Sequence, residues 1–133
     1  MNEKIKILIA DDNKAFCELL SKYLISIENI EILGIANSDE AEINMIDNLN
    51  PEIVITDLMR NRQYSGLEII RKYKQKEKSP IFLIISAAER QTIIDENEEL
   101  NIGGYIKKPF YDYGIIVEEL ITIKEKYIKP KNI

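Results

Sequence analysis

The sequence predicts an α/β fold, an open and doubly wound sheet of five parallel strands with five helices. Two observations support this prediction. Short apolar runs rich in β-branched residues alternate with helical patterns along the chain, and several of these runs are apolar at consecutive positions. Consecutive apolar positions are typical of strands that helices cover on both faces. Right-handed crossovers between such strands then place helices on both sides of the sheet.

Five apolar runs predict the strands. The four prolines and five glycines of the chain fall almost entirely between the periodic segments, where they act as chain breaks. The predicted strands cover residues 4–10, 30–35, 53–56, 81–85 and 104–106.

Helical patterns follow each predicted strand. In residues 13–27 apolar side chains recur every three or four positions, which predicts a helix with one buried stripe. Ser38 is the predicted N-cap of a second helix that reaches about Leu49, with acids in its first turn. Further helices are predicted at residues 67–76, at residues 89–100 and along a stripe of Ile116, Leu120, Ile123 and Tyr127.

The composition indicates one folded domain and excludes several classes of function. The chain has 133 residues, 45% of them hydrophobic, which suits a single domain with its own core. Its net charge of −5 argues against a nucleic-acid-binding surface in these residues. The chain has no His, which excludes Ser-His-Asp catalysis and His-ligated zinc, so any metal needs oxygen ligands. The single Cys and the short N-terminal apolar run predict a cytoplasmic protein without a membrane span.

Polar residues that could take part in catalysis or metal binding follow the ends of the predicted strands. Asp11 and Asp12 follow the first strand, Asp57 the third and Ser86 the fourth, and Lys108 follows the fifth. In doubly wound sheets the ligand site lies outside the carboxyl ends of the strands. Taken singly, each residue has a simpler explanation. An acid at position 11 or 12 can cap the next helix, a serine can serve a turn, and a lysine before proline can be a solvated charge.

Asp57 is the hardest of these residues to explain by a structural role. An unpaired acid beside a buried strand is costly, so a charged partner or a metal ion should lie close to it. Three carboxylates at one edge would repel one another, and Lys108 supplies only one positive charge. A divalent ion held by carboxylates and water, as Mg²⁺ is, removes this conflict.

The sequence resembles the receiver domain of two-component response regulators over essentially its whole length. The matching landmarks are Asp11-Asp12 after KILIA, Asp57 after EIVIT, Ser86 in LIISA and Lys108 in GYIKKPF. The resemblance implies a flavodoxin-like sheet with strand order 2-1-3-4-5. It also implies a receiver domain over residues 1–129, with residues 130–133 as a tail or the start of a linker.

The resemblance further implies a Mg²⁺-dependent phosphoryl transfer, with Mn²⁺ as a substitute. A histidine kinase, a histidine phosphotransfer protein or a small acyl phosphate would phosphorylate Asp57. Lys108 and Ser86 would contact phosphoryl oxygens, and the metal ligands would be Asp11, Asp12, Asp57 and the backbone carbonyl of Met59. Such a site works by positioning and charge neutralisation. The domain would catalyse its own phosphorylation and dephosphorylation and turn over no external substrate.

The same residues imply a switch. Ser86 would move toward the phosphoryl group and leave space for Tyr105 to turn inward, which would alter the face formed by the fourth helix, the fifth strand and the last helix. The alternative for Tyr105 is simple packing at the sheet edge. The resemblance also predicts a cis peptide bond between Lys108 and Pro109.

The loop after Asp57 departs from the family pattern. Receivers usually carry a Met-Pro turn there and a Gly eight residues after the acid, whereas this loop has no proline and Gly66 lies nine residues on. Two arginines, Arg60 and Arg62, stand in this loop. Either both are solvated charges, or one of them reaches the phosphoryl group and alters its lifetime.

Two alternative functions compete with that of an active receiver. A pseudo-receiver, a binding module without phosphorylation, would predict loss of an acid or the lysine, and all are present. A haloacid-dehalogenase-type phosphatase needs a second Asp two residues after the nucleophile, where this chain has Met59, and is rejected. The expected partners are therefore a kinase or phosphotransfer protein and an output domain or downstream protein, with homodimerisation left open.

Overall fold

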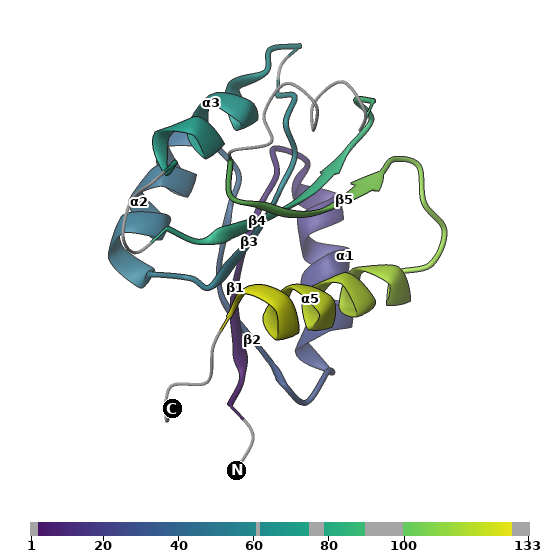
Figure 1. Cartoon of the computed structure of the whole chain (residues 1–133). Helices are drawn as coiled ribbons and strands as arrows, with labels where there is room; N and C mark the ends of the chain where they lie inside the picture. The colour runs from purple at the N-terminus through teal and green to yellow at the C-terminus, as the bar shows by residue number, and fades with distance from the viewer. Residues whose placement is uncertain (1–2, 61, 75–78, 90–99, 129–133) are drawn as a thin grey trace.

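Five parallel strands form one sheet, in the predicted order β2-β1-β3-β4-β5 (Figure 1). The computed structural model of the chain describes residues 3–60, 62–74, 79–89 and 100–128. The strands are β1 (Ile5–Ala10), β2 (Ile30–Ala36), β3 (Ile53–Thr56), β4 (Ile81–Ser86) and β5 (Ile102–Lys107). The predicted fold class is thus confirmed, and β5 begins two residues earlier than its sequence pattern suggested.

Four helices lie in the described part of the chain: α1 (Lys14–Ile25), α2 (Asp39–Leu49), α3 (Ser65–Lys72) and α5 (Gly114–Tyr127). The predicted helix at residues 89–100 falls mostly outside the described residues. None of the described helices is long and apolar enough to cross a membrane.

Local capping explains where α1 and α2 begin. The Asn13 side chain accepts from the N–H of Phe16, and the Ser38 side chain accepts from the N–H of Ala41, so the predicted N-cap is confirmed. Helix α2 ends at Leu49. Asn50 follows as its C-cap with a left-handed φ of 50°, and Pro51 comes next. A left-handed residue and then a proline are common ends of a helix.

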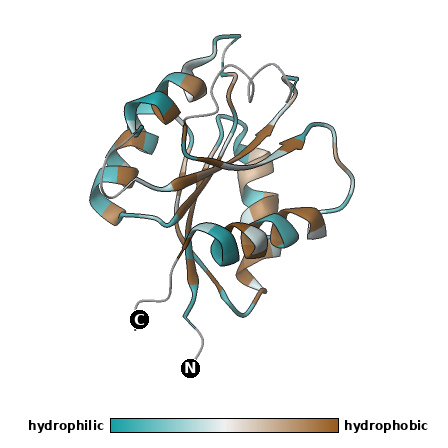
Figure 2. Ribbon diagram, in the orientation of Figure 1, coloured by the Kyte–Doolittle hydropathy of each residue, from teal (hydrophilic) through white to brown (hydrophobic). Residues whose placement is uncertain are grey.

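The core has two layers because successive side chains of a strand point to opposite faces of the sheet. In β1, Ile7 and Ile9 pack with α1 and α5, whereas Leu8 and Ala10 pack on the face that α2 and α3 cover. Figure 1 shows these two pairs of helices on opposite sides of the sheet. Figure 2 shows hydrophobic residues along the strands and a mixture of hydrophobic and hydrophilic residues on each helix. The continuous apolar runs therefore reflect burial on both faces.

The strand register brings the ends of β1 and β3 together. Ala10 pairs with Thr56, so the residues that follow them, Asp11 and Asp57, leave the sheet side by side. The strand order reverses at this pair, since β2 lies on one side of β1 and β3 on the other. This is the switch point at which ligands bind in open α/β sheets.

Candidate functional site

A lysine and two acids meet at the carboxyl edge of the sheet. Lys108 Nζ lies 3.0 Å from Asp57 Oδ2 and 3.1 Å from Asp11 Oδ2. Asp11 and Asp57 are only 3% and 9% exposed. The three residues follow β5, β3 and β1, as the sequence predicted, and the Lys108-Pro109 peptide bond is cis, also as predicted. One ammonium group is thus shared by two buried carboxylates.

Backbone groups fix the second oxygen of each carboxylate. The N–H of Met59 donates to Asp57 Oδ1 at 3.1 Å, and the N–H of Asn13 donates to Asp11 Oδ1 at 2.9 Å. Each carboxylate is therefore held between a backbone N–H and Lys108. The geometry orients both acids before any ligand arrives.

The electrostatics of this group are set by burial and by the shared ammonium. Burial raises the pKa of Asp11, and the Asn13 N–H and Lys108 oppose this rise. Burial would by itself lower the pKa of Lys108, but the Asp11 and Asp57 carboxylates outweigh it and raise that pKa. Lys108 therefore stays charged at neutral pH, and the formal charge of the two carboxylates exceeds what it neutralises.

Behind Asp11 lie two polar groups that sequence reasoning did not connect with the site. The Asn37 side-chain amide donates to the Asp11 carbonyl at 2.9 Å, and Cys17 Sγ lies 3.4 Å from the same oxygen. Burial, together with the Asp11 charge, raises the pKa of Cys17 to about 11, so the thiol is protonated at neutral pH. Both side chains serve to hold the end of β1 in place.

An aromatic ring completes the surroundings of Lys108. The ammonium lies 4.8 Å from the centroid of the Phe16 ring, within the range of a cation–π contact. The sequence placed Phe16 in the apolar stripe of the first helix and gave no sign of this contact. The Lys108 backbone N–H also donates to the Ser86 carbonyl at 2.8 Å, which ties the lysine to the end of β4.

Ser86 and Tyr105 meet at the loop after β4. The buried Ser86 Oγ accepts from the N–H of Ala88 at 3.3 Å. The Tyr105 hydroxyl donates to the Ala88 carbonyl at 2.5 Å, and the residue is 8% exposed. The Tyr105 side chain therefore already lies inward in this structure, while Ser86 contacts the same residue, Ala88. The predicted coupling between Ser86 and Tyr105 stays a prediction.

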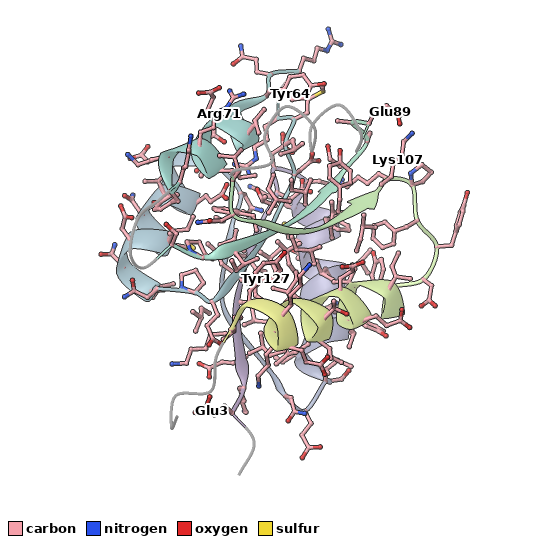
Figure 3. All side chains as sticks on the ribbon, in the orientation of Figure 1. Glu3, Tyr64, Arg71, Glu89, Lys107 and Tyr127 are labelled. Atoms are coloured by element: carbon pink, nitrogen blue, oxygen red, sulfur yellow. The ribbon has the colours of Figure 1, made fainter. Side chains whose placement is uncertain are left out.

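An open cavity of about 520 Å³ lies over this edge of the sheet. Figure 3 shows two of its lining residues, Tyr64 and Glu89, at the same end of the molecule. The cavity is large enough for a phosphoryl group. Its lining consists of Asp57, Met59, Arg62, Tyr64, Ser86, Ala87, Ala88, Glu89 and Lys108.

The structure gathers part of the predicted metal ligand set. Asp11 and Asp57 meet at Lys108, whereas Asp12 is exposed. In the described part of the chain, no group of three or more His, Cys, Asp or Glu side chains is arranged to hold a metal ion. The donor set is nevertheless all oxygen, with an excess of negative charge, and it fits a hard cation such as Mg²⁺. The complete ligand set, with Asp12 and the Met59 carbonyl, stays a prediction.

The loop between Asp57 and α3 is closed by a glycine. A side chain at Gly66 would meet the Asp57 carbonyl oxygen at 2.1 Å and Leu58 Cα at 2.8 Å, and the Gly66 N–H donates to the Leu58 carbonyl at 3.0 Å. Only a residue without Cβ fits so close to another backbone. The start of α3 is thereby fixed against the backbone of the acid.

Arg60 has neither of the two roles that the sequence suggested, a solvated charge or a contact with the phosphoryl group. It is 5% exposed and points away from the cavity, toward α2, where it pairs with two acids, so it is not a solvated charge and does not reach the phosphoryl site. Arg62, with a φ of 63°, does line the cavity, so the lifetime hypothesis now concerns Arg62 alone. The sequence did contain a sign of this pairing: Glu42 lies four positions before Ile46 on the buried face of a helix, where an acid needs a cation as partner.

Residues 7–120 match the family model described as "Response regulator receiver domain". The chain belongs to this family. The match runs from within β1 to the middle of α5 and includes all the strand-end residues described above. This receiver domain is therefore part of the two-component signalling machinery, and the resemblance stated from its motifs is confirmed.

Relatives of this receiver domain include a longer transcriptional regulator. The transcriptional regulatory protein YdfI of Bacillus subtilis (strain 168) is 32% identical over 103 residues, which is 77% of this chain and 47% of that protein. The chain thus spans about half the length of this curated relative.

Solved structures share the fold of the receiver domain at low sequence identity. The receiver domain of the putative regulator NarL from Mycobacterium tuberculosis is 19% identical, with a TM-score of 0.80, covering 93% of this chain and 98% of that one. The isolated receiver domain of RcsB from Salmonella enterica serovar Typhimurium, determined in the presence of phosphomimetic BeF₃⁻, is 22% identical. Its TM-score is 0.72, and the match covers 87% of each chain.

Proposed function

We propose that this receiver domain accepts a phosphoryl group on Asp57 from a histidine kinase or histidine phosphotransfer protein, or from a small acyl phosphate. The observation that carries the proposal is the position of Asp57. Its carboxylate lies at the cavity, with one oxygen 3.0 Å from Lys108 Nζ and the other 3.1 Å from the Met59 N–H. An acid so placed is oriented for attack and partly neutralised beforehand.

In the proposed reaction an Asp57 oxygen attacks phosphorus and forms a new O–P bond. The bond from phosphorus to the donor nitrogen or acyl oxygen breaks, and the donor leaves with its electron pair. Lys108 moves from sharing the carboxylates to pairing with a phosphoryl oxygen, and Ser86, which lines the same cavity, offers its hydroxyl to another. These residues stabilise charge that spreads over the phosphoryl oxygens in the transition state.

Asp11, Asp12, Asp57 and the Met59 carbonyl would hold Mg²⁺ or Mn²⁺. When bound, the ion supplies positive charge that Lys108 alone does not provide. Asp11 would join this set from its place beside Lys108, whose ammonium lies 3.1 Å from its Oδ2. The later hydrolysis would proceed by in-line attack of water on the same phosphorus, which returns the carboxylate of Asp57.

The phosphorylated domain would act as a switch in a signalling protein of the cytoplasm. The hydrogen bond from Tyr105 to the Ala88 carbonyl links β5 to the loop that carries the cavity wall, so a change at Ser86 reaches the face of β5 and α5 through Ala88. Because YdfI is named a transcriptional regulatory protein, a DNA-binding output in the same or an associated protein is the proposed target of this face.

Acetyl phosphate with Mg²⁺, followed by intact mass measurement, tests the proposal. We expect the wild-type chain to gain the mass of one phosphoryl group and Asp57→Asn to gain none. No gain in either protein would favour the pseudo-receiver instead. A gain in both would place the phosphoryl group elsewhere and contradict the role of Asp57.

A further inference from the structure

A second charged group lies on the far side of the same loop. Arg60 Nη1 lies 2.6 Å from Asp39 Oδ1, and its Nη2 lies 2.5 Å from Glu42 Oε1 and donates to Thr56 Oγ1 at 2.6 Å. We refer to Arg60, Asp39, Glu42 and Thr56 as the Arg60 cluster. The Arg60 and Glu42 side chains are 4% and 0% exposed. Helix α2, the end of β3 and the loop after β3 are therefore joined by one guanidinium group.

The Arg60 cluster brackets the phosphoacceptor along the chain. Thr56 directly precedes Asp57, and Arg60 follows it by three residues. The backbone of Arg60 also pairs with Gln63, through N–H to carbonyl contacts of 2.8 and 2.9 Å in the two directions. The segment that carries the Met59 peptide is therefore anchored on both sides. This loop has no proline to restrict it, so the side-chain anchor supplies a constraint that the backbone lacks.

Stability alone is a weak explanation for such a cluster. Two charges taken out of water lose their hydration, and their mutual attraction often does no more than offset this loss. Apolar residues of similar volume commonly fill such a space at equal or higher stability. An apolar pair would not make contacts of fixed direction, such as hydrogen bonds. A planar guanidinium with three fixed contacts defines where the backbone of Arg60 lies.

We propose that the Arg60 cluster positions the phosphoacceptor loop, with Arg60 as a positioning residue that acts through the Met59 peptide. By fixing the backbone at Arg60, the cluster keeps the Met59 N–H on Asp57 Oδ1 and the Met59 carbonyl in a constant place beside it. The inference about metal binding rests on the proposed function, in which that carbonyl is a ligand. The inference about the position of the Met59 peptide does not depend on the proposed function.

The test uses the double variant Arg60→Met/Glu42→Leu in the full chain. The single variant Arg60→Met would leave Glu42 buried without its cation and could fail to fold, whereas the double variant restores an apolar pair. Arg71→Met, which removes an arginine from an exposed pair with Glu68, is the matched control. Urea unfolding establishes that the double variant remains folded.

Hydrogen exchange at the Met59 amide is the first measurement, made without metal. We expect exchange in the double variant to be roughly tenfold faster than in the wild type, the factor for loss of one hydrogen bond to a charged group. The control should exchange at the wild-type rate. An unchanged Met59 rate in a folded double variant would overturn the proposal.

The dissociation constant for Mn²⁺, followed by the electron paramagnetic resonance of the free ion, is the second measurement. We expect it to rise roughly tenfold in the double variant, as when groups that orient a metal ligand are removed. An equal constant in both proteins would overturn the metal-binding part. A wild-type chain that takes up neither Mn²⁺ nor a phosphoryl group would refute the proposed function, and the Met59 exchange rate would then decide the role of the cluster.

Discussion

Two charged clusters lie near the end of β3, and each contains one cation and two acids. On one side Lys108 contacts Asp11 and Asp57, and on the other Arg60 contacts Asp39 and Glu42. Formal charge does not distinguish them. The Lys108 side chain is 27% exposed and borders an open cavity, whereas Arg60 is 4% exposed.

The difference between the clusters lies in access and in the geometry of the cation. An ammonium is a compact charge that can move from one oxygen to another, so Lys108 can release its acids to a ligand. A guanidinium in a planar fork is committed to several partners at once, and Arg60 makes three such contacts. The two proposals therefore assign different roles to similar charges: chemistry to the cluster that meets the cavity, and positioning to the enclosed one.

The largest expected effect is on stability in Arg60→Met. Removal of the cation leaves Glu42 buried and unpaired, and we expect the free energy of unfolding to fall by roughly 3–5 kcal/mol. Urea denaturation at pH 8, above the Glu42 pKa of about 7, measures this loss. The control Arg71→Met, at an exposed i,i+3 pair, should change by about 0.5 kcal/mol or less. Similar losses in both variants would show that the enclosure of Arg60 has no energetic consequence.

Lys108→Met should mainly affect the reaction. We expect the rate of phosphoryl uptake from acetyl phosphate to fall roughly 100-fold, the usual cost of removing one group that stabilises developing charge. The free energy of unfolding should fall less than in Arg60→Met, since Asp57 lines the open cavity, where water can replace the ammonium, whereas Glu42 is fully enclosed. Intact mass against time gives the rate. A larger loss of stability than in Arg60→Met would reverse the comparison of the two clusters.

The smallest expected effect is a pH dependence that belongs to the enclosed cluster. Burial raises the pKa of Glu42 from 4.5 to about 7, although Arg60 opposes the rise. The folded chain therefore binds a proton that the unfolded chain has released in this window, so stability falls as pH rises from about 4.5 to 7. Its share of the unfolding free energy is about 1–3 kcal/mol.

Glu42→Gln isolates this share, because glutamine does not titrate. Urea denaturation at pH 5 and pH 8 should show a steeper decline in the wild type than in the variant. Parallel declines in the two proteins would mean that Glu42 keeps one charge state throughout. The carboxylates beside Lys108 are common to both proteins and cancel in the difference.

The sequence predicted those parts of the molecule that depend on local pattern. Consecutive apolar residues gave the five strands, and residues at strand ends gave Asp11, Asp57 and Lys108, because parallel strands place all their carboxyl ends at one edge. The cis bond at Lys108-Pro109 followed from the family pattern. Helix α3 ends at Lys72 rather than at residue 76, since its apolar spacing does not mark the last turn.

The parts that the sequence did not reveal depend on which elements meet in space. The contact of Arg60 with Glu42 joins residues 18 positions apart, on the loop after β3 and on α2. The local sequence around either residue does not predict this pair. Tyr105 was predicted to turn inward after Ser86 moves, but its hydroxyl already reaches the Ala88 carbonyl. A side chain's orientation at a sheet edge is decided by the loop that covers it.

The two ends of the loop after Asp57 are fixed by different contacts. Gly66 fixes one end against the acid's own carbonyl, and Arg60 fixes the other end on α2. Arg60 and Gln63 pair through their backbones between these two ends, and we expect this turn to be the part whose length can change while the acid keeps its place. The cavity wall that carries Arg62 would then vary between related proteins independently of Asp57, and with it the lifetime of the phosphoryl group that we propose.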